Sequence, residues 1–138
     1  MLKPHYFVEN QQGGRNPHDK LKPETSAGIV REHVTEGVRL AKEAKVPESL
    51  IQFILEHHGT QRIGFFYEKA SEEADGDIDE ERFSYPGPKP QSMETAIVML
   101  ADSCESATRA LQDPTPERVR DLIDNVVEGK ISDRQLDE

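Results

Sequence analysis

Four side chains in this sequence are of the types that bind transition metals, and all four lie in segments with helical apolar periodicity. His57 and His58 are adjacent at the end of the apolar run 50–56. His33 and Asp102 lie in two other such segments. Neutral imidazole is the commonest protein ligand for transition metals, and a buried imidazole or carboxylate is costly unless its polar atoms have partners. These residues therefore predict part of a metal centre inside a helical bundle.

Each of the four residues also has an ordinary structural explanation. A single histidine on the apolar face of a helix, as at His33, is more often a hydrogen-bonded core residue than a ligand. The pair at 57–58 stands where the helix dipole favours a cationic side chain, and Asp102 could form a salt bridge. The His18–Asp19 pair follows a proline in a loop, and we interpret it as a turn beside a helix start. Because the four residues occur together, we favour a metal centre over a separate structural explanation for each residue.

Three further residues could contact a phosphorylated ligand. Thr60 follows the histidine pair, and its hydroxyl could bind a phosphate oxygen or act as a local cap. Lys89 is the basic residue of the Pro-rich loop 85–90, which could form a lid or only set the angle of the next helix. Arg109 lies seven residues after Asp102, on the same helical face, where it could clamp a phosphate or pair with an acid.

The predicted elements that position these residues are helices separated by turn residues. We expect a long loop with one helical turn over 1–24, and Thr25 or Ser26 can cap the helix that follows. Ser92 is expected to cap a long helix whose inward face carries Ala96, Ile97, Leu100 and Ala101. No segment alternates convincingly with a period of two. The fold class is all-α, with helices over about 25–45, 47–58, 61–74, 92–112 and 116–128.

Length, charge and cysteine content exclude several classes of protein. The 138 residues suffice for one domain with one core. A formal net charge of −10 argues against a partner that is a nucleic-acid polymer. The negative net charge does not exclude a small phosphorylated ligand, because a bound metal can supply local positive charge. The single cysteine excludes a disulfide framework and suits the cytoplasm, and no apolar run approaches the roughly 20 residues needed to span a bilayer.

The ordered motifs resemble the HD-domain metal-dependent phosphohydrolases. The closest likeness is to the cytoplasmic HD domain of the bacterial seven-transmembrane HD receptors, which are cyclic di-AMP phosphodiesterases. The resemblance covers nearly the whole chain and is carried by the segments 3–11, 16–19, 26–34, 54–60, 85–90 and 97–105. It implies an HD-like helical bundle in the cytoplasmic part of a bacterial inner-membrane protein that hydrolyses cyclic di-AMP to linear pApA.

By the same resemblance, His33, His57, His58 and Asp102 would be ligands in a two-metal site that usually holds iron or manganese. The His-Asp doublet that names the family, and another histidine upstream of it, would precede Met1. His18–Asp19 matches a different family stretch. The resemblance thus implies that 1–138 is an HD fragment without the N-terminal helices, with about half of the metal centre. Asp102 would share the first metal with the absent ligands, and the three histidines would mainly serve the second.

Two expectations and two alternatives follow. We expect this fragment to be inactive or nearly so alone, because a two-metal mechanism needs both ions. We also expect an uncovered apolar face and self-association into a homo-oligomer. Within enzymes, the alternative is another HD hydrolase, such as a nucleotidase or deoxynucleotide triphosphohydrolase. From another class, the alternative is a non-catalytic helical regulatory or interaction module that keeps the histidines as relics.

Overall fold

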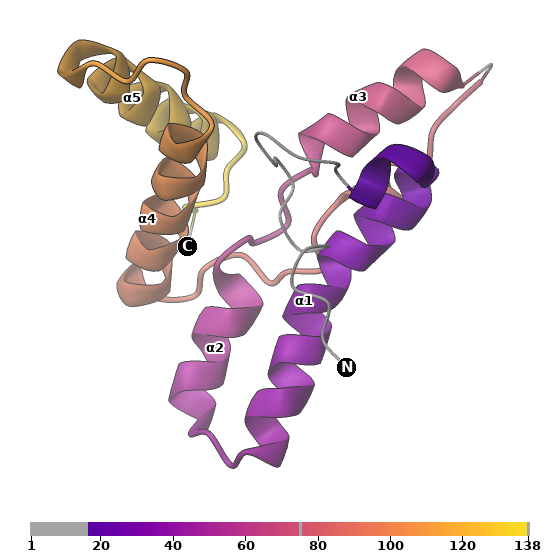
Figure 1. Ribbon diagram of the computed structural model, residues 1–138. Helices are drawn as coiled ribbons and strands as arrows, with labels where there is room; N and C mark the ends of the chain where they lie inside the picture. Colours follow the sequence, from indigo (N-terminus) through magenta and orange to yellow (C-terminus); the bar gives the residue numbers. More distant parts are fainter. Residues whose placement is uncertain (1–16, 75, 138) are drawn as a thin grey trace.

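The described part of the protein, residues 17–74 and 76–137 of a computed structural model, consists of helices joined by turns and loops (Figure 1). The predicted all-α class with about five helices is confirmed. Two short 3₁₀ helices, η2 and η3, accompany the α-helices, and in these residues the β pairing is limited to one isolated bridge between Arg62 and Ser84. The elements are η2 (Pro17–Lys20), α1 (Pro23–Glu43), α2 (Glu48–Glu56), α3 (Gly64–Glu73), η3 (Glu80–Phe83), α4 (Met93–Arg109) and α5 (Pro116–Ser132).

The helices form two groups whose members pack side by side. Figure 1 shows α1 and α2 as an antiparallel hairpin, with α3 beside the first half of α1. In the other group α4 packs against α5, and α4 also contacts α2. The main core lies between α1, α3 and the segment around η3. Its buried residues are Ala27, Val30, Val34, Ile63, Phe66, Ala70, Phe83 and Tyr85.

The first residues of α4 and α1 show which predicted helix start is right and which is wrong. The predicted cap at Ser92 is confirmed, since its hydroxyl accepts from the Thr95 N–H in a reciprocal capping box. The predicted cap at Thr25 or Ser26 is wrong, because α1 already begins at Pro23. Proline suits the first helical position, where its missing N–H would have had no partner. Much of the predicted loop 1–24 lies outside the described residues.

The helix predicted to start at residue 61 starts at Gly64 instead. Residues 61–63 are held in an extended conformation by the segment after η3. The Ile63 N–H donates to the Phe83 carbonyl at 2.6 Å, and the Tyr85 N–H donates to the Gln61 carbonyl at 2.9 Å. This long-range pairing overrides the local helical pattern and brings Tyr85 beside the end of α2.

The predicted inward face of α4 is partly wrong. Met99 and Thr95 are buried, whereas Ile97 is 58% exposed and Ala101 is also exposed. The helix is therefore rotated so that Thr95 and Met99 face the end of α2. Met93, at 77% exposure, adds to the uncovered apolar surface. An uncovered apolar surface was expected; self-association through it stays a prediction.

Within residues 17–74 and 76–137, no helix is both long and apolar enough to cross a bilayer.

A buried carboxylate joins the end of α2 to the start of α4. Glu56 is 3% exposed and accepts hydrogen bonds from the Thr95 hydroxyl at 2.6 Å and from the Gln91 N–H at 2.8 Å. A buried carboxylate is tolerated only when its oxygens are satisfied in this way. Because Glu56 directly precedes His57, and α4 carries Asp102, the contact holds two predicted ligand segments together.

Thr95→Val should destabilise the fold by about 1–3 kcal/mol, since the isosteric change removes a hydroxyl donor from a buried carboxylate. Urea unfolding followed by circular dichroism measures the change. Thr35→Val is the matched control, because the Thr35 hydroxyl is exposed and bonds only a carbonyl of its own helix. The control should stay within about 0.5 kcal/mol of the original protein. Equal effects of the two substitutions would contradict a structural role for the Glu56 contact.

Candidate metal centre

Three histidines from two helices converge on one point. His33 lies in α1, and His57 and His58 directly follow α2. One ring nitrogen from each lies within 4.8 Å of the others, and all three side chains are partly buried. The shortest approach is 3.2 Å, between Nε2 of His33 and Nε2 of His57. The predicted convergence of the histidines is therefore present in the structure.

The hydrogen bonds of the rings determine which nitrogens carry lone pairs. Nδ1 of His33 lies 2.5 Å from the Val30 carbonyl oxygen, and Nδ1 of His57 lies 2.8 Å from the Ile54 carbonyl oxygen. A carbonyl only accepts, so each Nδ1 carries the proton, and in the neutral ring the lone pair is on Nε2. Two lone pairs thus face each other at 3.2 Å. A shared cation satisfies this arrangement, and the spacing fits two ligands bound at about 2.1 Å to one ion.

His58 supplies the third nitrogen and is oriented by its surroundings. Its ring stacks on Tyr85, with centroids 4.2 Å apart and an interplanar angle of 15°. Burial, reinforced by His57, His33 and Lys130, lowers the pKa of His58 to about 2. The ring is therefore neutral near pH 7. Burial also lowers the pKa of His33, so His33 and His58 favour the neutral imidazole, the form that binds metals.

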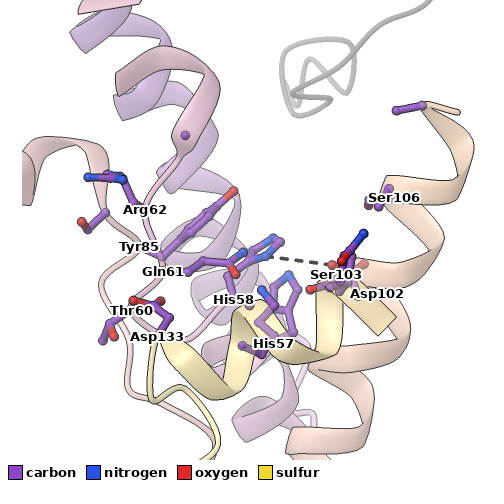
Figure 2. Close-up of a pocket in the computed structure, with 18 of the residues that line it drawn as sticks. His57, His58, Thr60, Gln61, Arg62, Tyr85, Asp102, Ser103, Ser106 and Asp133 are labelled. Carbon is purple, nitrogen blue, oxygen red and sulfur yellow. Dashed lines mark ion pairs between the residues drawn. The ribbon is translucent and has the colours of Figure 1, made fainter. Parts of the chain in front are cut away.

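Asp102 reaches the same site from α4. Figure 2 shows its carboxylate facing His58, and the distance from Oδ2 to Nδ1 of His58 is 3.9 Å. Because His58 is neutral, this contact is not a charge pair. Nδ1 of His58 is buried and has no hydrogen-bond partner among the described residues. The Asp102 side chain is 40% exposed and so remains accessible. An unsatisfied imidazole nitrogen opposite an accessible carboxylate fits a metal site.

The cluster opens into a cavity of about 1020 Å³ between the two groups of helices. Among the three predicted ligand-contacting residues, Thr60 and Arg109 line this cavity (Thr60 is labelled in Figure 2). Arg109 pairs with Glu105 of its own helix. Lys89 is not among the lining residues, and its Nζ donates to the Arg134 carbonyl at 2.7 Å. The structure thus brings together all the predicted site residues except Lys89.

Sequence reasoning missed several residues of the site. Tyr85 was assigned only to a Pro-rich loop, yet it covers one face of His58. Lys130 is buried and lines the cavity, but the predicted last helix ended at residue 128. The available signals were the aromatic residue before Pro86 and the continued helical pattern past Gly129. By contrast, His18 is buried in the core against Phe66, with ring centroids 5.2 Å apart, and it does not line the cavity.

Three imidazoles that could hold a metal ion converge in an all-α domain, with a carboxylate facing one of them. Residues 4–107 match the family model for the HD domain, and the chain belongs to this family. Residues 108–138, including α5, lie beyond the match.

Two curated relatives of this chain are both named cyclic-di-AMP phosphodiesterase PgpH. The protein from Bacillus subtilis is 46% identical over 136 residues, and the one from Listeria monocytogenes is 42% identical over 137 residues. Each alignment covers 99% of this chain but 19% of the relative, so the chain spans about a fifth of their length.

Two solved structures of the L. monocytogenes PgpH HD domain have the same fold as this chain. The TM-scores are 0.88 for one structure and 0.89 for the structure in complex with cyclic di-AMP, both at 41% identity. Each match covers 96% of this chain and 62% of the solved one.

His57→Ala should weaken binding of Co²⁺, a spectroscopic probe for this donor set, by at least about 100-fold, because it removes one of the two facing Nε2 ligands. Titration monitored by the visible Co²⁺ absorption measures the affinity. The matched control is His18→Ala, which removes an imidazole that does not line the cavity. It should leave the affinity of the folded chain unchanged. Equal Co²⁺ affinity for the original chain and His57→Ala would refute the predicted ligand role of His57.

Proposed function

We propose that this chain is part of the catalytic domain of a metal-dependent phosphodiesterase that hydrolyses cyclic di-AMP to linear pApA in the bacterial cytoplasm, in a membrane-anchored parent. The observation that carries the proposal is the pair of imidazole Nε2 atoms facing each other at 3.2 Å beside a large cavity. Membership of the HD family, and relatives named as cyclic di-AMP phosphodiesterases, support the reaction and the substrate. The similar solved structure of the L. monocytogenes PgpH HD domain in complex with cyclic di-AMP supports a cyclic dinucleotide as the ligand.

The proposed metal ligands are His33, His57, His58 and Asp102. This mixed imidazole and carboxylate set suits iron and manganese, which we propose as the metals. In such a site a divalent ion polarises the phosphodiester and supplies hydroxide at neutral pH. The chain's own contribution is orientation: the Val30 and Ile54 carbonyls hold two rings in the required tautomer, and the Tyr85 ring holds His58.

Charges around the cavity make ligand binding dependent on the metal. The lining cations are Arg62, Arg109 and Lys130, and the lining acids are Glu80, Asp102 and Asp133, so the two signs are equal in number. The whole chain also has a net charge of −10. A dianionic dinucleotide therefore gains little net attraction from the side chains alone, and we propose that the metal supplies the missing positive charge.

Cyclic di-AMP should bind this chain at least about tenfold more tightly with Mn²⁺ present than in EDTA, because the metal adds the charge that the cavity lacks. Isothermal titration calorimetry measures both affinities. With Mn²⁺, Arg109→Ala should weaken binding by about tenfold, since it removes a lining cation. Lys89→Ala is the matched control and should have no effect, because Lys89 does not line the cavity. Equal affinity in Mn²⁺ and EDTA would contradict the proposed dependence on metal.

We propose that residues 1–138 alone turn over cyclic di-AMP slowly or not at all. Among the described residues, the clustered donors are three imidazoles with one nearby carboxylate. A two-metal mechanism needs two ions about 3.5–4 Å apart, each with its own ligands.

A longer protein that contains this chain with its flanking sequence should hydrolyse cyclic di-AMP at least about 100-fold faster than the 138-residue chain, because a second ion would then be held. Product formation with Mn²⁺ or Fe²⁺, followed by chromatography, measures the difference. His57→Ala in the longer protein is the control for metal dependence and should remove the activity. Robust turnover by the 138-residue chain would overturn the half-site proposal. Preference for a nucleoside triphosphate in the longer protein would instead favour a nucleotidase.

A further inference from the structure

We propose that Gln135, in the turn after α5, is a positioning residue for the metal centre. The inference rests on the proposed metal site and adds a residue outside the part of the chain that matches the HD family, residues 4–107. Gln135 is 2% exposed although it is a polar residue in the turn three residues after the end of α5. Its side chain is buried against the loop that follows His57 and His58.

Both ends of the Gln135 amide are hydrogen-bonded. Oε1 accepts from the Thr60 backbone N–H at 3.0 Å, and Nε2 donates to the Thr60 hydroxyl at 3.1 Å. Nε2 also donates to Oδ2 of Asp133 at 2.8 Å. Thr60 is two residues from His58, so the amide holds the backbone that carries the third imidazole. A single side chain thus connects the last turn of the fold to the ligand pair.

Gly59 leaves the space in which the Gln135 amide packs against the loop after His58. Gly59, between His58 and Thr60, has a φ of +55°, and a Cβ there would lie 2.3 Å from Oε1 of Gln135. The same Cβ would lie 2.8 Å from Cε of Met99. A side chain at position 59 would therefore displace the amide or Met99, besides being strained by its backbone conformation. Gly59 lets Gln135 pack directly on the backbone beside the ligands.

The turn that carries Gln135 is itself held at several points. The Gln135 N–H donates to the Lys130 carbonyl at 3.0 Å, which closes the end of α5. Lys89 Nζ donates to the Arg134 carbonyl at 2.7 Å, so the segment before α4 contacts the turn from another side. These bonds leave the Gln135 side chain in a defined direction, toward Thr60.

This contact links the two helix groups across the cavity. Because α5 packs on α4, which carries Asp102, the Gln135–Thr60 bonds tie the carboxylate side of the site to the histidine side. Without the Gln135–Thr60 bonds, fewer contacts between the two helix groups would hold Asp102 at its distance from His58. Residues that orient metal ligands through such bonds typically change metal affinity by about 10–100-fold when they are replaced.

The test compares Gln135→Met, which keeps the shape and loses the hydrogen bonds, with the double variant Gln135→Glu/Asp133→Asn. The double variant keeps an acceptor for the Thr60 N–H and replaces the adjacent Asp133 carboxylate by an amide that can donate. Asp137→Ala is the matched control in the same turn, because Asp137 is exposed and its carboxylate accepts a hydrogen bond from Arg134 rather than from Thr60. In the metal-free chain, NMR measures hydrogen exchange of the Thr60 amide and the ring resonances of His57 and His58. In the metal-loaded chain, the Co²⁺ affinity and visible spectrum are measured.

Gln135→Met should lose protection of the Thr60 amide, shift the histidine ring resonances and weaken Co²⁺ binding by about tenfold with an altered spectrum. The double variant Gln135→Glu/Asp133→Asn should retain the protection and most of the affinity, and Asp137→Ala should match the original chain. Wild-type Thr60 protection and ring resonances in a folded Gln135→Met would overturn the proposal. If Gln135→Met does not fold, loss of Thr60 protection in a folded Gln135→Glu/Asp133→Asn variant overturns it. Absence of Co²⁺ binding by the original chain refutes the metal site and leaves the metal-free comparison decisive for Gln135.

Discussion

The site depends on two imidazole rings whose Nε2 atoms are made to face each other. Each ring donates its Nδ1 proton to a carbonyl of its own helix, so the remaining lone pairs on His33 and His57 point at one another across 3.2 Å. Partial burial removes the water that would otherwise solvate these nitrogens, and it lowers the pKa of His33. A cation shared between the two nitrogens removes this conflict, and the remaining features of the site surround that position.

Most of the surrounding structure serves to hold the end of α2. Glu56 connects it to the start of α4 through Thr95, and Tyr85 covers the His58 ring. Gln135 holds the backbone of Thr60 from the opposite side. These contacts come from segments that are distant in sequence, so the ligand geometry is a property of the whole fold. A short loop after a helix would otherwise be mobile, and metal ligands need orientation to within small distances.

The chemistry of the site was more predictable from the sequence than its supporting contacts. His33, His57, His58 and Asp102 could be found because ligand-type residues are uncommon on apolar helical faces, and helical periodicity placed them inward. Their ligand role stays a prediction, while their convergence is observed. Local rules also located the Ser92 cap, since a capping box depends on neighbouring residues alone.

The predictions that were wrong share a physical cause: they concern features that depend on contacts between residues distant in the sequence. The extended segment before α3 forms because residues near Phe83 supply hydrogen-bond partners, and no local pattern encodes that pairing. The rotation of α4 that exposes Ile97 follows from the burial of Thr95 beside Glu56. Lys89 could not be excluded from the cavity without knowing that the last turn presents the Arg134 carbonyl to it. The sequence gives no indication that Gln135 is buried, since a polar residue in a turn after a helix is ordinarily exposed.

X-ray absorption spectroscopy of the manganese- or iron-loaded chain tests the central claim most directly. The account predicts an imidazole scattering pattern from two to three histidine nitrogens at about 2.1 Å, with oxygen ligands completing the shell. A first shell made only of oxygens, without imidazole scattering, would mean that the facing nitrogens of His33 and His57 do not bind the metal. That result would contradict the account.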